Sequence, residues 1–131
     1  MTISFDRALG IHERALATRV QRAEVLANNL ANADTPGFKA RDIDFRAVLA
    51  QAGQSGELSM QRTHANHLPL TDGAGSVDVL YRNPLQPAID GNTVDTQYEL
   101  AQYTRNAMDY QSSFQFLNSK FKGLVSAIKG E

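Results

Sequence analysis

The residues with the most obvious chemical potential are His64 and His67, three positions apart, with Asp72 five residues further on. Imidazole and carboxylate groups at such spacing can converge on a divalent ion. The segment has a loop-like composition, however, and the third histidine of the chain, His12, lies in a separate helical segment. Solvated or locally hydrogen-bonded histidines explain the motif better than a metal site does, so we predict no bound metal.

Asp42 and Asp44 form a second pair of groups that could do chemistry, as two neighbouring carboxylates. On an extended strand they would alternate with Ile43 and Phe45 and point to the polar side of that strand. The chain has no cysteine, and its sequence contains no Gly-rich phosphate loop, nucleophile elbow or zinc-ligand spacing. We therefore predict that the protein is not an enzyme and needs no cofactor.

The balance of charge and hydrophobicity limits the partners of this 131-residue chain. Thirteen basic residues against fourteen acidic ones give a net charge of -1, which disfavours nucleic acid and anionic membrane surfaces. No apolar run approaches the roughly 18 residues that a membrane helix needs. Residues 1–7 lack the basic region and apolar core of a secretory signal peptide. The sequence thus predicts a protein that stays inside the cell, unless a route without a cleaved signal exports it.

A helical pattern begins near Ser4 and continues to Asn32 with one glycine and no proline. Ser4 is the expected N-cap, and Asp6 follows in the first turn, where the helix dipole favours an acidic residue. The run 32–37 then stops the helix, because its proline lacks an amide hydrogen. This first segment is assigned to residues 1–33, and its apolar stripe consists of Phe5, Leu9, Leu16, Val20, Ala23, Ala27 and Leu30.

The stronger pattern lies in residues 92–131, where apolar side chains alternate spacings of three and four without interruption. Such a register over four heptads is typical of a coiled-coil seam. Asn92 and Thr93 are the expected N-cap residues of this helix, and several lysines near its end suit the helix dipole. The seam consists of Leu100, Tyr103, Ala107, Tyr110, Phe114, Leu117, Phe121, Leu124 and Ile128.

The residues that flank this seam are small or uncharged, whereas a free-standing two-stranded coiled coil usually carries opposite charges there. Met108, Phe116 and Val125 add apolar surface outside the seam. The pattern favours a helix that packs on several neighbours over a helix with a single partner. We expect most of the seam to pack against the first helix as ordinary core, and part of it to face other chains.

Residues 46–91 differ in composition, with five of the nine glycines and three of the four prolines. Two stretches in it, Leu58–Thr63 and Val77–Tyr81, are strand-like, so the segment is either a small β-rich insert or a long loop. We therefore predict a mainly α fold. Two long terminal helices pack as an antiparallel coiled-coil-like hairpin, with a small irregular or β-containing middle insert. Such a hairpin buries little apolar surface, so the isolated subunit should be partly unfolded at its ends until it assembles.

A longer motif spans the end of the first helix and the residues after it. Residues 26–45 contain the run ANNLANADTPGFKARD, which resembles the N-terminal signature of flagellar rod and hook proteins. The run 41–45, the insert that begins near Thr63, residues 90–95 and the short length resemble the proximal-rod members of the flagellar basal-body rod family in particular. The resemblance covers both ends of the chain well and the middle loosely. Within it, residues 34–45 form a signature turn and an extended segment.

The signature has the residue types that end a helix and redirect the chain. Asparagine side chains can hydrogen-bond free backbone groups at a helix end, and Pro-Gly favours a turn. Two interpretations remain open: the turn only terminates the helix, or it also contacts neighbouring subunits. The signature residues are Asn28, Asn29, Asn32, Thr35, Pro36, Gly37 and Phe38.

The resemblance implies a structural subunit of the bacterial flagellar basal body, located in the periplasmic proximal rod. Such a subunit is exported by the flagellar type III apparatus without a cleaved signal peptide. It self-assembles helically with other rod proteins to form the drive shaft and export channel of this motility organelle. The alternative is a soluble helical adaptor or export chaperone that binds partners through the C-terminal seam. Neither function involves nucleic acid, a small-molecule substrate or an integral membrane segment.

Overall fold

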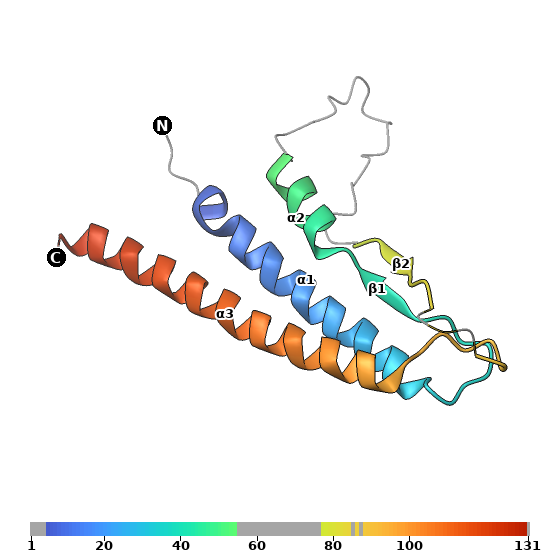
Figure 1. Cartoon of the computed structure of the whole chain (residues 1–131). Coiled ribbons are helices and arrows are strands. Elements are labelled where there is room, and N and C mark those ends of the chain that lie inside the picture. The colour runs from blue at the N-terminus through green and yellow to red at the C-terminus, as the bar shows by residue number, and fades with distance from the viewer. Residues whose placement is uncertain (1–4, 55–76, 85, 87, 131) are drawn as a thin grey trace, which may run out of the picture.

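The structure, a computed structural model, describes residues 5–54, 77–84, 86 and 88–130. Its elements follow the order α1, β1, α2, β2, α3 along the chain (Figure 1). Several sequence predictions lie outside the described residues: the Ser4 cap, the strand Leu58–Thr63 and the histidine motif of His64, His67 and Asp72.

Two long helices dominate the molecule and run antiparallel to each other (Figure 1). Helix α1 spans Phe5–Ala31 and helix α3 spans Thr96–Lys129, and the two pack together along their length. The mainly α hairpin with a small β-containing middle segment is therefore confirmed. Among the helices of the described residues, none is both long enough and apolar enough to cross a membrane.

Helix α3 begins one turn later than the sequence pattern suggested. Its N-cap is Asp95, whose carboxylate accepts hydrogen bonds from the backbone N–H groups of Gln97 and Tyr98. The prediction of Asn92 or Thr93 as the cap was wrong, because both side chains bond to residues 32–40 instead. At the other end α3 stops at Gly130, whose backbone is left-handed with a φ of 75°.

The middle of the chain forms a two-stranded ribbon and a third helix. Strand β1, Arg41–Ile43, pairs antiparallel with strand β2, Val79–Tyr81. Helix α2, Phe45–Gln54, follows β1 directly and was not predicted. Asp44 caps it, since its carboxylate accepts hydrogen bonds from the backbone N–H groups of the second and third residues of the helix. Asp42 lies in the strand and Asp44 at a helix start, so the two carboxylates serve different purposes.

Helix α1 is the centre of the fold, because α3 packs on one side of it while α2 and the ribbon pack on another (Figure 1). In the described part of the chain, few apolar side chains are fully enclosed, and half of the buried residues are polar. The buried apolar residues are Leu9, Ala15, Leu26, Ala40 and Ile43, and the buried polar ones are Thr18, Asn29, Asn92, Glu99 and Asn106.

Candidate assembly surface

Most of the apolar seam of α3 faces solvent. Seven of its nine side chains are exposed, and only Leu117 and Leu124 are half-buried. The exposed fraction is 56% for Leu100, 43% for Tyr103 and 54% for Phe114. The expectation that this seam packs mainly against the first helix is therefore not met in the single chain.

The face of α3 that meets α1 is polar. It consists of five side chains spaced three and four apart, which we call the polar ladder: Glu99, Gln102, Asn106, Asp109 and Ser113. Each ladder residue directly precedes a seam residue, so Glu99 precedes Leu100 and Ser113 precedes Phe114. One residue corresponds to a rotation of about 100° around a helix. The seam therefore lies well to one side of the line of contact between the helices.

Specific hydrogen bonds join the ladder to α1. Asn29 Nδ2 donates to Glu99 Oε2 at 3.1 Å, and Arg22 Nη2 donates to Gln102 Oε1 at 3.2 Å. Asn106 Nδ2 donates to the backbone oxygen of Arg19 at 2.8 Å. The guanidinium of Arg19 completes the set with bonds of 3.0 Å to Asp109 and 3.1 Å to Ser113. Glu99 and Asn106 are almost fully enclosed, with exposed fractions of 1% and 2%.

The predicted stripe of α1 is displaced from the contact line in the same way. Leu9 is buried and Leu16 and Ala23 are half-buried, whereas Val20, Ala27 and Leu30 are exposed. The side chain of Phe5 lies outside the described residues. The α1 residues that bond to the ladder precede stripe members by one position: Arg19 precedes Val20, Arg22 precedes Ala23 and Asn29 precedes Leu30.

The two apolar stripes lie on the same side of the helix pair. In each helix the stripe residues come one position after the contact residues, so the stripe lies about 100° around the helix from the line of contact. Because the helices are antiparallel, these two rotations place both stripes on the same side of the pair. Helix α2 packs on α1 on the opposite flank, where Arg14, Thr18 and Gln21 of α1 line the groove between the two helices. We call the exposed members of both stripes the apolar face: Val20, Ala27, Leu30, Leu100, Tyr103, Ala107, Tyr110, Phe114, Phe121 and Ile128.

An ionic network fastens the β ribbon to the helix pair. Asp42 of β1 accepts hydrogen bonds from Arg22 at 2.8 Å and from Arg82 at 2.8 Å, and Arg82 also pairs with Glu99. Burial by itself would raise the pKa of Asp42, but the bonds from Arg22, from the backbone of Ile43 and from Arg82 outweigh it. The pKa of Asp42 therefore lies below its usual value, and the bond to Asp42 raises that of Arg22. An aromatic ring also lies beside the network, since the guanidinium of Arg82 is 4.9 Å from the Tyr98 ring centre.

The signature residues work through the backbone of the segments around them. The side chain of Asn29 donates to the carbonyl of Arg41 at 2.7 Å and accepts from its N–H at 3.0 Å, so it pairs with the start of β1 as a strand residue would. Asn32 donates to the carbonyl of Asn28 at the end of α1. Gly37 adopts a φ of 72° in the turn, a conformation that favours glycine. Asn28 and Phe38 lie beside these groups, where Asn28 accepts from Arg41 and the carbonyl of Phe38 accepts from Thr93.

A second segment, residues 90–93, closes onto the signature turn. The side-chain amide of Asn92 donates to the carbonyls of Asn32, Ala33 and Thr35, where α1 ends. The N–H of Gly37 donates to the carbonyl of Asp90 at 2.9 Å. The sequence pattern missed this role of Asn92, because the helix end that it satisfies is about 60 residues away in the chain.

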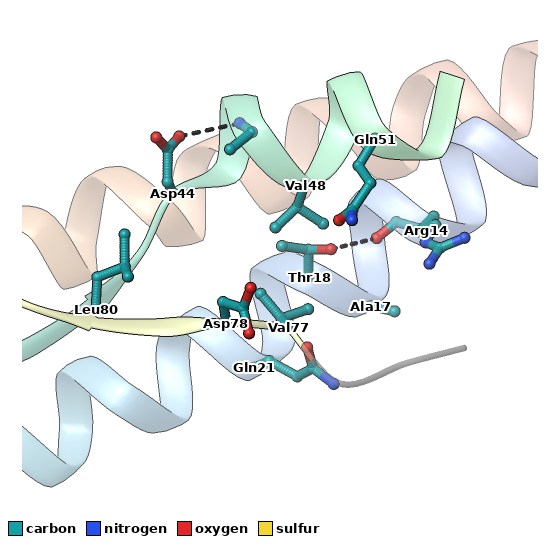
Figure 2. Close-up of a pocket in the computed structure, with 11 residues that line it drawn as sticks. Arg14, Ala17, Thr18, Gln21, Asp44, Val48, Gln51, Val77, Asp78 and Leu80 are labelled. Carbon is teal, nitrogen blue, oxygen red and sulfur yellow. Dashed lines mark hydrogen bonds between the residues drawn. The ribbon is translucent and has the colours of Figure 1, made fainter. Parts of the chain in front are cut away.

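A groove on the other flank of α1 is the best-formed pocket in the described part of the chain (Figure 2). Its volume is about 210 Å³, and α1, α2 and the residues around β2 line it. Two of its polar side chains are engaged within the chain: the Thr18 hydroxyl donates to the carbonyl of Arg14, and Asp44 caps α2. Among the described residues, no group of three His, Cys, Asp or Glu side chains could hold a metal ion. The exposed apolar face, and not this groove, is the feature that the fold leaves unexplained.

Comparison with known proteins connects this geometry to a family. The family model described as "Flagella basal body rod protein" matches residues 9–39, which include the signature. The flagellar basal body rod protein FlgB of Aeromonas hydrophila is 52% identical over 132 residues, covering 100% of this chain and 99% of that protein. The FlgB proteins of Cereibacter sphaeroides and Salmonella typhimurium are 44% and 41% identical, over 97% and 95% of this chain. The chain belongs to the family of flagellar basal body rod proteins FlgB.

Proposed function

We propose that this protein is a structural subunit of the proximal flagellar rod, and that neighbouring subunits cover its apolar face. The observation that carries the proposal is the orientation of α1 and α3 about their own axes. The two helices pair through the polar ladder, and most of their apolar stripe residues stay exposed. Contiguous apolar surface on a small protein marks a site of interaction. A seam with coiled-coil spacing indicates that the partner surfaces are also helices.

The energetic case follows from the size of the exposed side chains. Burying one large apolar side chain contributes about 1.5–3 kcal/mol, and the face carries Leu100, Tyr103, Tyr110, Phe114 and Phe121 on α3 alone. These side chains are 40–56% exposed, so neighbouring helices would recover about half of this contribution from each on assembly. Met108 and Phe116 are 61% and 65% exposed outside the seam, which favours several neighbours around α3 over one.

The family supports a role in the basal body together with other flagellar proteins. We extend this to a position in the periplasmic part of the rod, reached by flagellar type III export without a cleaved signal peptide. In that setting, the subunit would stack helically with its own kind and with other rod proteins. The relatives favour a structural role over an enzymatic one, and none of their names supports an adaptor or an export chaperone.

The substitution Phe114→Asp tests the proposal in flagellated cells. A carboxylate at the centre of the apolar face should prevent incorporation into the rod, because burial against a neighbour would strip it of water. Export of the variant should persist, while purified basal bodies should lack it and the cells should not swim. The matched control is Gln115→Asp, which adds the same charge at an exposed polar position one residue along. Normal rods built from the Phe114→Asp protein would contradict the proposal.

A further inference from the structure

The register of the helix pair permits two different pairings. The bonds Asn29–Glu99 and Arg19–Asp109 fix which residues of the antiparallel helices lie opposite each other. Moving one residue forward in each helix converts these pairs into Leu30–Leu100 and Val20–Tyr110. Continuing at helical spacing gives every remaining stripe residue from Leu9 onward an apolar seam partner: Ala27–Tyr103, Ala23–Ala107, Leu16–Phe114 and Leu9–Phe121.

A rotation of both helices by one residue, with a slide of about 3 Å along their axes, would therefore bring the two apolar stripes together inside the chain. Burial of apolar area alone would favour this pairing, since the stripes would leave water without any partner subunit. The structure instead holds the pairing in which Glu99 and Asn106 are enclosed and Phe114 is exposed. Something other than apolar burial must select the observed rotation.

We propose that the polar ladder selects this rotation and so keeps the apolar face available to other subunits. Glu99 is the central residue, because it accepts from Asn29 of α1 and pairs with Arg82 beside β2. Its carboxylate thus binds α1 and the ribbon at once, and rotation of α3 would break both interactions. Arg22 acts likewise from α1, with bonds to Asp42 and Gln102. Fixing the register of packed helices is the best-attested role of buried polar groups.

The burial of Asn106 has a cost in stability. Its Nδ2 donates to the carbonyl of Arg19, but its Oδ1 is buried and has no hydrogen-bond partner in the part of the chain that the structure describes. An unsatisfied buried acceptor lowers stability. An alanine or leucine at this position would remove that cost, but it would leave the helices free to rotate. A role in fixing the rotation therefore explains the asparagine at 106.

The inference deepens the proposed function, since it rests on the apolar face being the surface that assembles. Its test therefore uses the isolated full chain at high dilution, where rod assembly has no part. The protein has no cysteine, so pairs of introduced cysteines report the rotation by intrachain disulfide formation. The pair Ala15→Cys with Ser113→Cys lies on the ladder line, and the pair Ala23→Cys with Ala107→Cys lies on the stripe line. Because the first pair replaces Ser113 of the ladder, the natural ladder in this test means that Glu99, Gln102, Asn106 and Asp109 are unchanged.

With the natural ladder, the Ala15/Ser113 cysteine pair should form its disulfide much faster than the Ala23/Ala107 pair. Adding Asn106→Asp should invert this order, because it removes the donor and places a carboxylate against the carbonyl of Arg19. The control Asn118→Asp, at an exposed position of α3, should leave the order unchanged. Electrophoretic mobility of the monomer, with the bond confirmed by mass spectrometry, gives both rates.

Two outcomes would overturn the inference. Equal rates for the two cysteine pairs with the natural ladder would show that the ladder does not select a rotation. A loss of both disulfides on Asn106→Asp would show that the ladder only stabilises the hairpin. Failure of the proposed function is distinct from either result, since it appears as normal rods with Phe114→Asp whatever the disulfide rates are.

Discussion

At the scale of single residues, side chains far apart in the sequence satisfy backbone groups that secondary structure leaves free. Asn92 is the clearest case, because one buried side chain serves the carbonyls of Asn32, Ala33 and Thr35 at the end of α1. Gly37 and Gly91 meet at the same place with φ angles of 72° and 75°, and a Cβ on Gly91 would lie 3.8 Å from Cα of Gly37. The family signature thus encodes a turn that two segments build together.

Replacing Asn92 by alanine should lower the free energy of unfolding by about 1–3 kcal/mol, because the carbonyls at the end of α1 lose the hydrogen bonds that the buried Asn92 amide donates. Urea titration followed by circular dichroism measures the change. Asn118→Ala, which truncates an exposed asparagine of α3, serves as the control and should have little effect. Equal stability of the two variants would contradict the capping role.

The ionic network predicts a specific dependence of stability on pH. The pKa of Asp42 is lowered in the folded protein, so its contribution is fully present above the unfolded pKa of about 3.9. That contribution is lost as the pH falls through the lower, folded pKa. Asp42→Asn should therefore reduce stability at neutral pH and flatten the acid limb of the stability curve. Asp34→Asn, at an exposed position, should leave the loss of stability at acid pH unchanged. The same loss of stability in Asp42→Asn as in the natural protein would refute the prediction.

At the scale of elements, periodicity located both long helices but not the direction in which their apolar stripes face. A helical pattern reveals the apolar side of a helix, and the usual assumption is that this side meets the chain's own core. Here the helices meet through Glu99, Asn106 and Asn29, which no apolar pattern singles out. Helix α2 escaped prediction because Asp44, its cap, also fitted the polar side of an extended strand, and the following insert is rich in glycine and proline.

The attachment of the β ribbon to α3 should depend on Arg82. Removing it leaves the enclosed carboxylate of Glu99 without its cationic partner, and breaking a buried pair in this way costs about 3 kcal/mol or more. Arg82→Gln should accordingly destabilise the chain far more than Arg105→Gln, which changes an exposed arginine of α3. Thermal unfolding of both variants gives the comparison. Similar melting temperatures would mean that the network does not hold the ribbon.

At the scale of the whole molecule, the helix pair is covered on one flank and exposes the apolar face on the other. The ribbon and α2 cover one flank of α1 (Figure 1). Val20, Tyr103 and Phe114, which belong to the apolar face, remain exposed. Few apolar side chains are enclosed among the residues that the structure describes, so partner subunits should contribute a large share of the stability. The helical content and the melting temperature of the isolated protein should therefore rise with concentration. A fully helical, cooperatively melting monomer at high dilution would argue against this dependence.

The most direct test of the account is a structure of the assembled rod at side-chain resolution, from purified basal bodies. We predict that α1 and α3 keep the polar ladder between them and that Tyr103, Tyr110 and Phe114 pack against helices of neighbouring subunits. The same side chains facing solvent in the assembled rod, or meeting the stripe of their own α1, would contradict the account.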